Sequence, residues 1–373
     1  MAKYQVILRI DGTYLGDVRS LAQNLSWTKC RTFVGVDSIS FTLNDELFNL
    51  WCQARNTSID QILKPMALEC RIVRDGVELL GGYLATMPSY QPNQVSANLS
   101  MQFDGWFNYL GGVYMPPVGT QSGRMGALVQ KWITYADDKA KTAGKAFNFV
   151  VGDIQTLANV EYTFDNYKLI KDAITDRCDN TTGAGKFEVV WHADRTYDVV
   201  ADADFGEVIS DYVVYYPTRL NGVSATSISA SEVSGFYSHV IGIGAGEISS
   251  NADENTAITY TEGDSDFVKE YGYAEELIQD SEISVLNTLK RNVQSELARA
   301  TDLRWSPEIT LIGKQVAPVP SGSRRIWIGD TITIVNNLDR TGMTNGAFRV
   351  KQLDVSVSAT DSETITPTME RVV

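Results

Sequence analysis

The sequence predicts a β-rich α+β protein in which two β-rich blocks bracket a block of mixed helices and strands. Residues 68–112 contain the clearest alternation of apolar and polar side chains, which is typical of half-buried strands. An apolar stripe with helical spacing follows in residues 125–141, and strand patterns return after residue 305. Because the clearest patterns build sheets and carry no catalytic motif, the sequence favours a scaffold.

The first block begins with short strands. Residues 4–10 and 14–18 alternate on either side of Asp11-Gly12, a dipeptide that favours a tight turn because glycine accepts a positive φ. We expect another strand at residues 38–43 and a short helix at residues 44–51.

The end of the first block is the most regular part of the chain. Residues 68–84 predict a β-hairpin that turns at Asp75-Gly76, and residues 95–103 alternate strictly between apolar and polar side chains. Three aromatic residues follow: Trp106, Phe107 and Tyr109. Their large apolar areas predict either a plug at the end of a small barrel or part of a subunit interface. The block ends near Pro116-Pro117.

The middle block changes to helices. We expect a loop at residues 119–123 and then a helix whose inward face consists of Leu128, Val129, Trp132, Ile133 and Ala136. A second helix is predicted at residues 167–178, followed by a hairpin that turns at Ala193-Asp194. This helix and hairpin predict a compact inserted domain.

The third block returns to strands after residue 206. The predicted strands cover residues 213–220, 223–229, 238–243, 308–312, 331–335 and 348–357. A polar stretch at 247–266 has loop composition and is the best candidate for a flexible or partner-contacting segment. A long helix is predicted over residues 274–301, ending before Pro307 because the residue before a proline avoids the α region.

The charge of the chain argues against specific nucleic-acid recognition. The net charge is −14 over 373 residues, and acidity increases from −1 in residues 1–120 to −8 in residues 241–373. Proteins that bind nucleic acid derive much of their affinity from Lys and Arg at the phosphates. An acidic wall that repels DNA and lets it slide remains compatible with this composition.

Neither a membrane span nor a disulfide framework is predicted. No apolar run approaches the roughly 20 residues that cross a bilayer, and the N-terminus alternates like a strand. We therefore expect the protein to be made and folded in a cytoplasm. The four cysteines, Cys30, Cys52, Cys70 and Cys178, have no metal-binding spacing, so reduced core thiols are the preferred interpretation.

The sequence predicts no catalytic residue, no metal ligand and no cofactor. His192 and His239 lie in no known catalytic or metal-binding motif. The adjacent acids are interpreted as solvated loop residues: Asp202 and Asp204, Asp253 and Glu254, Asp264 and Asp266, and Glu275 and Glu276. Asp264-Ser265-Asp266 lacks the remaining pattern of a calcium loop. The glycines at 242, 244 and 246 do not have the spacing of a dinucleotide site, and we interpret them as close packing at a strand end.

The order of these elements resembles the baseplate or tail-tip hub proteins of tailed bacteriophages, a group that includes the upper part of type VI secretion spikes. The resemblance rests on VRDGVELLGGYL and VSANLSMQFDGWFNYLGG in the first block and on the inserted TFDNYKLIKDAITDRCDNTTGAGKFEVVWHADRTYDVV. It continues in NGVSATSISASEVSGFYSHVIGIGAGE and IWIGDTITIV of the third block.

The resemblance implies two β-barrel domains that bracket an inserted α+β domain. The implied divisions are a first barrel at 1–116, with strands within 206–232 as candidates to complete it, an inserted domain at 117–205, and a second barrel at 206–373 that includes the helix 274–301. Three such chains would form a homotrimeric ring with pseudo-sixfold symmetry. The ring would join the hexameric tail tube to a threefold tail tip or spike.

The same resemblance implies partners and a location. A hub is a structural virion protein at the tail tip that contacts the distal tail or tail tube protein and a central spike or fibre protein. Tape-measure protein and then phage DNA pass through its lumen. Since no lytic domain follows the second barrel, wall degradation is expected to belong to another protein. The alternatives are a distal tail protein or other ring component, a tail-tip peptidoglycan hydrolase or peptidase, and a receptor- or carbohydrate-binding module.

Overall fold

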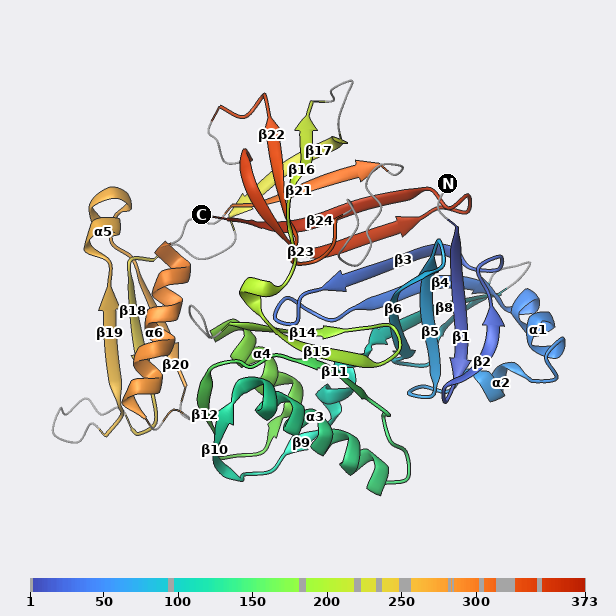
Figure 1. The fold of residues 1–373 in the computed structure, drawn as a ribbon, viewed down its shortest axis with the longest axis horizontal. Helices are drawn as coiled ribbons and strands as arrows, with labels where there is room; N and C mark the ends of the chain where they lie inside the picture. Colours follow the sequence, from blue (N-terminus) through green and yellow to red (C-terminus); the bar gives the residue numbers. More distant parts are fainter. Residues whose placement is uncertain are drawn as a thin grey trace. The chain divides into compact units, whose positions relative to one another are not determined.

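The computed structural model describes residues 3–92, 97–180, 186–217, 223–232, 237–247, 256–280, 283, 285–301, 305–312, 326–340 and 344–372. The chain divides into two compact units. The larger unit comprises Met1–Cys178, Ala184–Ala230 and Pro307–Val373, and the smaller unit comprises Asp179–Gly183 and Ser231–Ser306. The predicted β-rich α+β class is confirmed (Figure 1). Within the described residues, no helix has the length and apolar content needed to span a membrane.

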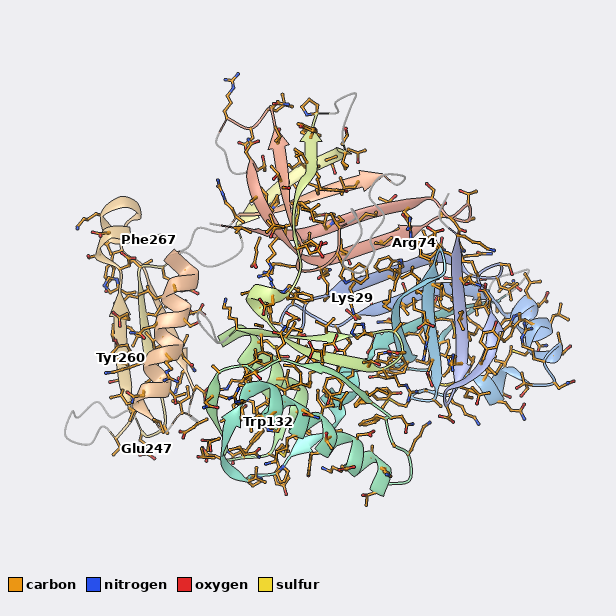
Figure 2. The ribbon with its side chains drawn as sticks, viewed as in Figure 1. Lys29, Arg74, Trp132, Glu247, Tyr260 and Phe267 are labelled. Atoms are coloured by element: carbon orange, nitrogen blue, oxygen red, sulfur yellow. The ribbon has the colours of Figure 1, made fainter. Side chains whose placement is uncertain are left out.

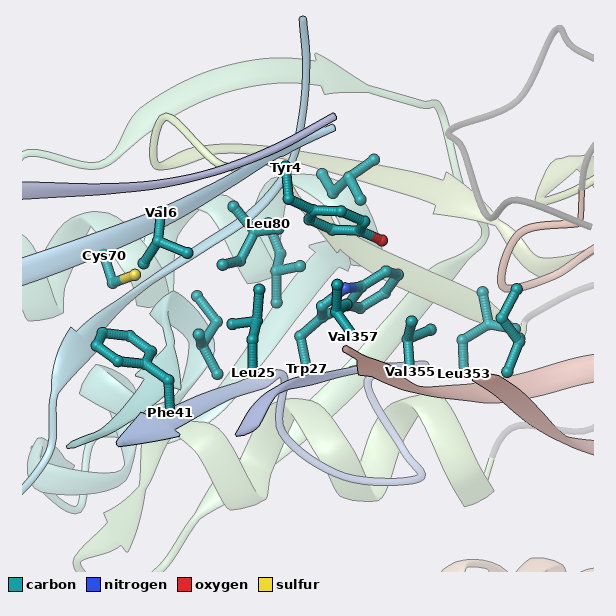
Figure 3. Close-up of a cluster of buried hydrophobic side chains, with 14 of the residues drawn as sticks. Tyr4, Val6, Leu25, Trp27, Phe41, Cys70, Leu80, Leu353, Val355 and Val357 are labelled. Carbon is teal, nitrogen blue, oxygen red and sulfur yellow. The ribbon is translucent and has the colours of Figure 1, made fainter. Parts of the chain in front are cut away.

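The first block of the larger unit forms a strongly curved sheet in the order β2-β1-β5-β6-β8-β4-β3, with β7 paired to β8. Its strands are β1 (Tyr4–Ile10), β2 (Thr13–Asp17), β3 (Gln23–Cys30), β4 (Ser38–Asn44), β5 (Leu68–Arg74), β6 (Val77–Leu84), β7 (Ser89–Pro92) and β8 (Ala97–Gly105). Figure 3 shows side chains of β1, β5 and β6, such as Val6 and Leu80, facing Leu25, Trp27 and Phe41 of β3 and β4. Because opposite parts of one sheet enclose this core, the block is barrel-like.

The third block contributes a closed barrel of six strands in the order β23-β22-β16-β17-β21-β24, which closes because β24 pairs with β23. The strands are β16 (Val208–Tyr216), β17 (Val223–Glu232), β21 (Trp305–Ile312), β22 (Thr331–Asn336), β23 (Gly346–Val357) and β24 (Glu363–Arg371). In the described residues, β16 pairs with β22 on one side and with β17 on the other, and both pairs belong to this barrel. The candidate completion of the first barrel by strands within 206–232 therefore gains no support.

One strand pair joins the two barrel-like parts. β3 pairs antiparallel with β23 from Leu25 opposite Val357 to Cys30 opposite Gln352, so the two parts belong to one 14-stranded sheet. A single apolar cluster extends across this pair, and Trp27 of β3 lies 6.4 Å from Trp327, centroid to centroid. Both β3 and β24, which make the joint and the closure, lie outside the strands predicted from the sequence.

The free edge of the curved sheet is covered by a helix. Helix α1 (Asp45–Gln53) is followed by a short helix, α2 (Ile59–Ile62). Arg55 donates from Nε to the carbonyl of Leu15 at 2.9 Å, and Trp51 donates from Nε1 to the carbonyl of Asp17 at 3.3 Å. A Cβ on Gly16 would lie 2.9 Å from both side chains, so glycine permits this close approach. Covering an edge in this way prevents it from pairing with other strands.

The inserted part follows the first sheet. It contains the 3₁₀ helix η1 (Trp106–Gly112), β9 (Tyr114–Met115), β10 (Gly119–Arg124), α3 (Met125–Thr142), β11 (Val150–Ile154), β12 (Asn159–Phe164), β13 (Lys168–Leu169), α4 (Ile170–Asn180), β14 (Phe187–Trp191), β15 (Thr196–Ala201) and the 3₁₀ turn η3 (Asp202–Asp204). The predicted loop at 119–123 was wrong, because these residues form β10 opposite β12. The segment GTQSGR is polar and contains two glycines, a composition typical of loops. It nevertheless forms a strand, which is exposed over most of its length.

The smaller unit is a three-stranded sheet with a helix on one face. Its elements are β18 (His239–Ile243), β19 (Thr259–Gly263), α5 (Ser265–Tyr271), β20 (Glu275–Gln279) and α6 (Leu286–Thr301), and its sheet order is β19-β18-β20. The helix packs through Leu289, Val293 and Leu297. A Cβ on Gly242 would lie 2.4 Å from Val293, which confirms the interpretation of the glycines here as close packing.

Two predictions in the smaller unit need correction. The predicted helix over 274–301 begins only at Leu286, because 275–279 form β20 parallel to β18. The apolar and polar residues of EELIQ fit the spacing of a helix as well as that of a strand. Pairing with β18 therefore decides its conformation. The predicted polar loop at 247–266 contains β19 and the start of α5, while residues 248–255 lie outside the described residues.

Candidate functional site

The three predicted aromatic residues are buried in a second core. Trp106, Phe107 and Tyr109 lie in η1 and are 1%, 5% and 4% exposed. They pack with the helices and the β14–β15 hairpin of the inserted part, and Tyr109 stacks on Tyr83 with ring centroids 3.8 Å apart. They therefore fasten the end of the first sheet to the inserted part and present little surface to another subunit. Their contribution to stability stays a prediction.

The turn of the β14–β15 hairpin is anchored to the first sheet. Trp106 donates from Nε1 to the carbonyl of Ala193 at 3.2 Å. Arg195 pairs with the buried carboxylate of Glu69 at 2.5 Å, and its guanidinium lies 5.0 Å from the ring centre of Trp106. A cation over an indole face is attracted by the ring quadrupole. This turn therefore holds the inserted hairpin against β5.

A buried ionic cluster lies where the first sheet, the inserted hairpin and the second barrel meet. Arg31, directly after β3, is 2% exposed and pairs through Nε with Glu188 of β14 at 3.1 Å. The same guanidinium contacts Asp202 of η3, which also pairs with Arg349 of β23 at 2.9 Å. Glu370 of β24 lies 3.6 Å from Arg31. We call these five residues the junction.

The charges in the junction depend on each other. Burial opposes the ionised form of Asp202, but Arg31 and Arg349 hold the pKa of this carboxyl below its ordinary value. Burial also opposes the charge on Arg31, yet the neighbouring carboxylates raise the pKa of its guanidinium. Removing one partner would leave a buried charge uncompensated. The interpretation of Asp202 as a solvated loop acid was therefore wrong.

Further ion pairs connect the first sheet to β24 and the turn before it. Arg74 of β5 and the hydroxyl of Tyr4 both contact Glu363, each at 2.5 Å. Arg19 pairs with Asp361 at 2.7 Å. On the hairpin side, Lys29 donates to the carbonyl of Trp191 at 2.9 Å; Figure 2 labels Lys29 and Arg74. These contacts reinforce the β3–β23 pair.

A groove of about 590 Å³ lies on the outer face of the β14–β15 hairpin. The hairpin directs Val189 and Val199 into the inner core, so Val190 and Val200 line the groove together with Leu79 of β6. The remaining lining includes Glu78, Asp194, Asp198, Asp204, Trp327 and Ile328. The groove thus combines apolar walls with acidic groups.

Asp330 lies at the barrel side of the groove and is 2% exposed. Its carboxylate accepts hydrogen bonds from the backbone N–H of Trp327 at 2.7 Å and of Glu207 at 2.9 Å. Burial raises the pKa of Asp330 to about 6, because a carboxylate loses solvation inside the protein.

The remaining polar residues occupy ordinary structural positions. Nε2 of His192 lies 2.7 Å from Asp198, whereas His239 packs against Tyr273 with ring centroids 4.5 Å apart. Asp264 accepts from the backbone N–H groups of Asp266 and Phe267 and so caps α5, which explains the Asp-Ser-Asp pattern. Asp253 and Glu254 lie outside the described residues.

The cysteines resemble core thiols. No disulfide joins any two of the four, and burial raises the pKa of Cys30 to about 12 and of Cys52 to about 11. Such thiols are protonated at neutral pH, whereas nucleophilic cysteines have a lowered pKa. Among the residues that the structure describes, no group of three or more His, Cys, Asp or Glu side chains is arranged to hold a metal ion.

The comparisons with known proteins point to phage tails. A family model described as "Prophage endopeptidase tail" matches residues 227–366. The fold is similar to that of the tail protein from Neisseria meningitidis MC58, with 12% identity, a TM-score of 0.63, and coverage of 99% of this chain and 96% of that one. No curated protein matches the chain.

Two further solved structures agree. The 43 kDa tail protein of prophage MuSo2 from Shewanella oneidensis has 11% identity and a TM-score of 0.60, with 98% of both chains covered. Prophage tail protein gp18 from Listeria monocytogenes EGD-e has 10% identity and a TM-score of 0.53, with 98% of this chain and 94% of that one covered. The likeness concerns the fold, and the predicted resemblance to phage tail proteins is confirmed.

The junction residues were missed in the sequence. Arg31, Glu188 and Arg349 lie far apart along the chain. Arg31 and Arg349 both contact Asp202, and they come from the region where β3 pairs with β23. The one local signal was Glu188, an acid inside the apolar run Phe187–Trp191. A charged residue in such a run indicates either an exposed strand face or a buried ion pair, and here it is the latter.

Proposed function

We propose that this chain is a structural protein of the phage tail, the hub of the baseplate or tail tip, which assembles as a homotrimeric ring. The observation that carries the proposal is the 14-stranded sheet of the larger unit, in which two barrel-like parts are joined by the β3–β23 pair. The family model and the shared fold support a structural tail protein.

The two barrel-like parts suit a symmetry adaptor. Three copies would place six barrel-like parts around an axis, which matches a hexameric tail tube on one side and a threefold tip or spike on the other. Such a ring needs a fixed angle between the two parts of each copy. The buried pairs of Arg31 and Arg74 supply rigidity on the two sides of the β3–β23 pair.

The proposed partners follow from this position. The ring would contact the distal tail or tail tube protein and a central spike or fibre protein, and tape-measure protein and DNA would pass through its lumen without sequence recognition. The net charge of −14 supports passage without adhesion. The division into a first barrel at 1–116, an inserted domain at 117–205 and a second barrel at 206–373 remains part of the proposal, and the main segment of the smaller unit, Ser231–Ser306, is an insertion within the sequence of the second barrel.

The mass of the purified chain in solution tests the proposal. Native mass spectrometry should give three times the 41.2 kDa of one chain. A sixfold mass would favour the alternative of a distal tail protein, and a monomer at every concentration would contradict the hub.

A second candidate function is a tail-tip peptidase, favoured by the word endopeptidase in the description of the matching family. The contact of His192 with Asp198 at 2.7 Å is the arrangement in which a carboxylate orients a general base. The hub proposal expects no cleavage of peptidoglycan or of tail proteins. Cleavage that His192→Ala abolishes, with the fold retained, would establish the enzyme.

A further inference from the structure

The lining of the groove beside the junction combines apolar and acidic side chains. Leu79, Val190 and Ile328 give it an apolar lining, and Asp194, Asp198 and Asp204 make it acidic. Its volume of about 590 Å³ lies within the range of protein binding pockets. An apolar side chain accompanied by a basic one has the complementary chemistry.

The loop between β22 and β23 presents this pair. Leu338 is 65% exposed, and Arg340 follows two residues later on the surface. Exposure of a single leucine is ordinary, but the described residues on either side of this one are held by side-chain hydrogen bonds. How well Leu338 can serve as a binding anchor depends on how rigidly the residues around it are held.

Several hydrogen bonds hold the described residues of this loop, 336–340 and 344–345. Asn336 accepts from the backbone N–H of Leu338 through Oδ1 at 3.0 Å. The carboxylate of Asp339 accepts from both the N–H and the hydroxyl of Thr344 at 2.6 Å, and Asn345 donates to the carbonyl of Asn336 at 3.1 Å. A segment ordered in advance loses little conformational entropy when it binds. Residues 336–340 are therefore a preformed support for an exposed apolar anchor.

The loop and the groove lie at opposite ends of β22. Asp330, which lines the groove, directly precedes the strand at Thr331, whereas the loop begins where the strand ends at Asn336. Six residues of strand span roughly 20 Å. Leu338 consequently cannot enter the groove of its own copy, although it can enter that of a second copy.

We infer that Leu338 and Arg340 of one copy occupy the groove of the neighbouring copy. The contact joins two different surfaces, and such head-to-tail contacts close into rings when the rotation between copies permits. The inference rests on the proposed homotrimer and names the surfaces that hold it together. Arg340 would lie near Asp198 and Asp204, where charge complementarity favours one orientation of the two copies.

The test compares two exposed leucines. Leu338→Asp should raise the dissociation constant of the trimer roughly thirtyfold, the loss expected for a hot-spot side chain, with an unchanged melting temperature of the monomer. Leu50→Asp is the matched control, because Leu50 on α1 is 60% exposed and lies outside the groove and the loop. Sedimentation equilibrium over a concentration series measures both.

Charge reversal adds a second arm. Arg340→Asp and Asp204→Arg should each weaken the trimer, and the double variant should recover most of the loss if the two side chains meet. A wild-type trimer that Leu338→Asp leaves equally tight overturns the inference while the hub proposal stands. A wild-type chain that remains monomeric removes the basis of both.

Discussion

The two units of the chain differ in how they are stabilised. The larger unit contains two extensive apolar cores and several buried ion pairs. The core cluster of the smaller unit contains three buried apolar residues among those described: Val240, Val293 and Leu297. Its main segment, residues 231–306, has fourteen Asp and Glu against five Lys and Arg. The extensive apolar cores and the buried ion pairs thus occur in the unit that contains both barrel-like parts.

The largest expected effect concerns the aromatic cluster of the larger unit. Trp106→Ala and Phe107→Ala should each cost roughly 3 to 5 kcal/mol of unfolding free energy, because each leaves a cavity in a packed core. Chemical denaturation measures the loss. Tyr14→Ala, at a side chain that is 60% exposed, should change it by less than roughly 0.5 kcal/mol. Stable monomers that assemble poorly would instead identify the cluster as an interface.

A comparable effect is expected at the junction. Arg31→Met leaves Glu188, 1% exposed, without its cationic partner, and a broken buried pair costs roughly 3 to 5 kcal/mol. The double variant Arg31→Met with Glu188→Gln should recover part of this loss, since no unpaired charge remains between these two positions. Urea unfolding of both variants decides the matter. Equal losses in both would mean that packing, and not the charge, stabilises the junction.

We expect the smaller unit to unfold independently of the larger unit. Leu297→Ala should cost roughly 2 to 3 kcal/mol, a large share of what so small a core supplies. Amide hydrogen exchange should then show reduced protection in β18, residues 239–243, and unchanged protection in β3, residues 23–30. Leu277→Ser, at a side chain that is 54% exposed, is the control. Loss of protection in both strands would show that the two units unfold together.

The smallest expected effect depends on pH and concerns Asp330 of the larger unit. Its pKa is raised from 3.8 to about 6 by burial, so between these values the folded protein retains a proton that the unfolded chain has lost. The free energy of unfolding should therefore fall, by roughly 1 to 3 kcal/mol, as the pH rises from 4 to 6.5. Asp330→Asn should lack this contribution. Identical pH dependences of the two proteins would contradict the raised pKa.

The sequence predicts the individual strands and helices of this fold better than the strand pairs that join and close its barrel-like parts. Asp75-Gly76 joins β5 and β6 as a hairpin turn, and the helical stripe from Leu128 to Ala136 is buried in α3. These patterns depend on neighbours in the chain. β3, in contrast, pairs with β23, which lies hundreds of residues away. β24 closes the barrel by pairing with β21 as well as with its chain neighbour β23, and β20 adopts a strand because β18 lies beside it.

In the candidate site, too, only residues with a local signal in the sequence could be predicted. Trp106, Phe107 and Tyr109 were identifiable because a dense aromatic group indicates a core locally. Arg31 and Glu188 carry no local signal that separates a buried ion pair from two surface charges. The groove and the loop at Leu338 need the full topology, since neither has a recognisable motif.

In the proposed hub, the two barrel-like parts of one chain fill two of the six positions of a pseudo-sixfold ring, and three copies complete it. A reconstruction of the phage tail tip tests this arrangement most directly. We expect three copies at the end of the tail tube, with six barrel-shaped densities around one axis and the two densities of each copy joined through β3 and β23. Six copies in the ring, or a position away from the tube axis, would contradict it.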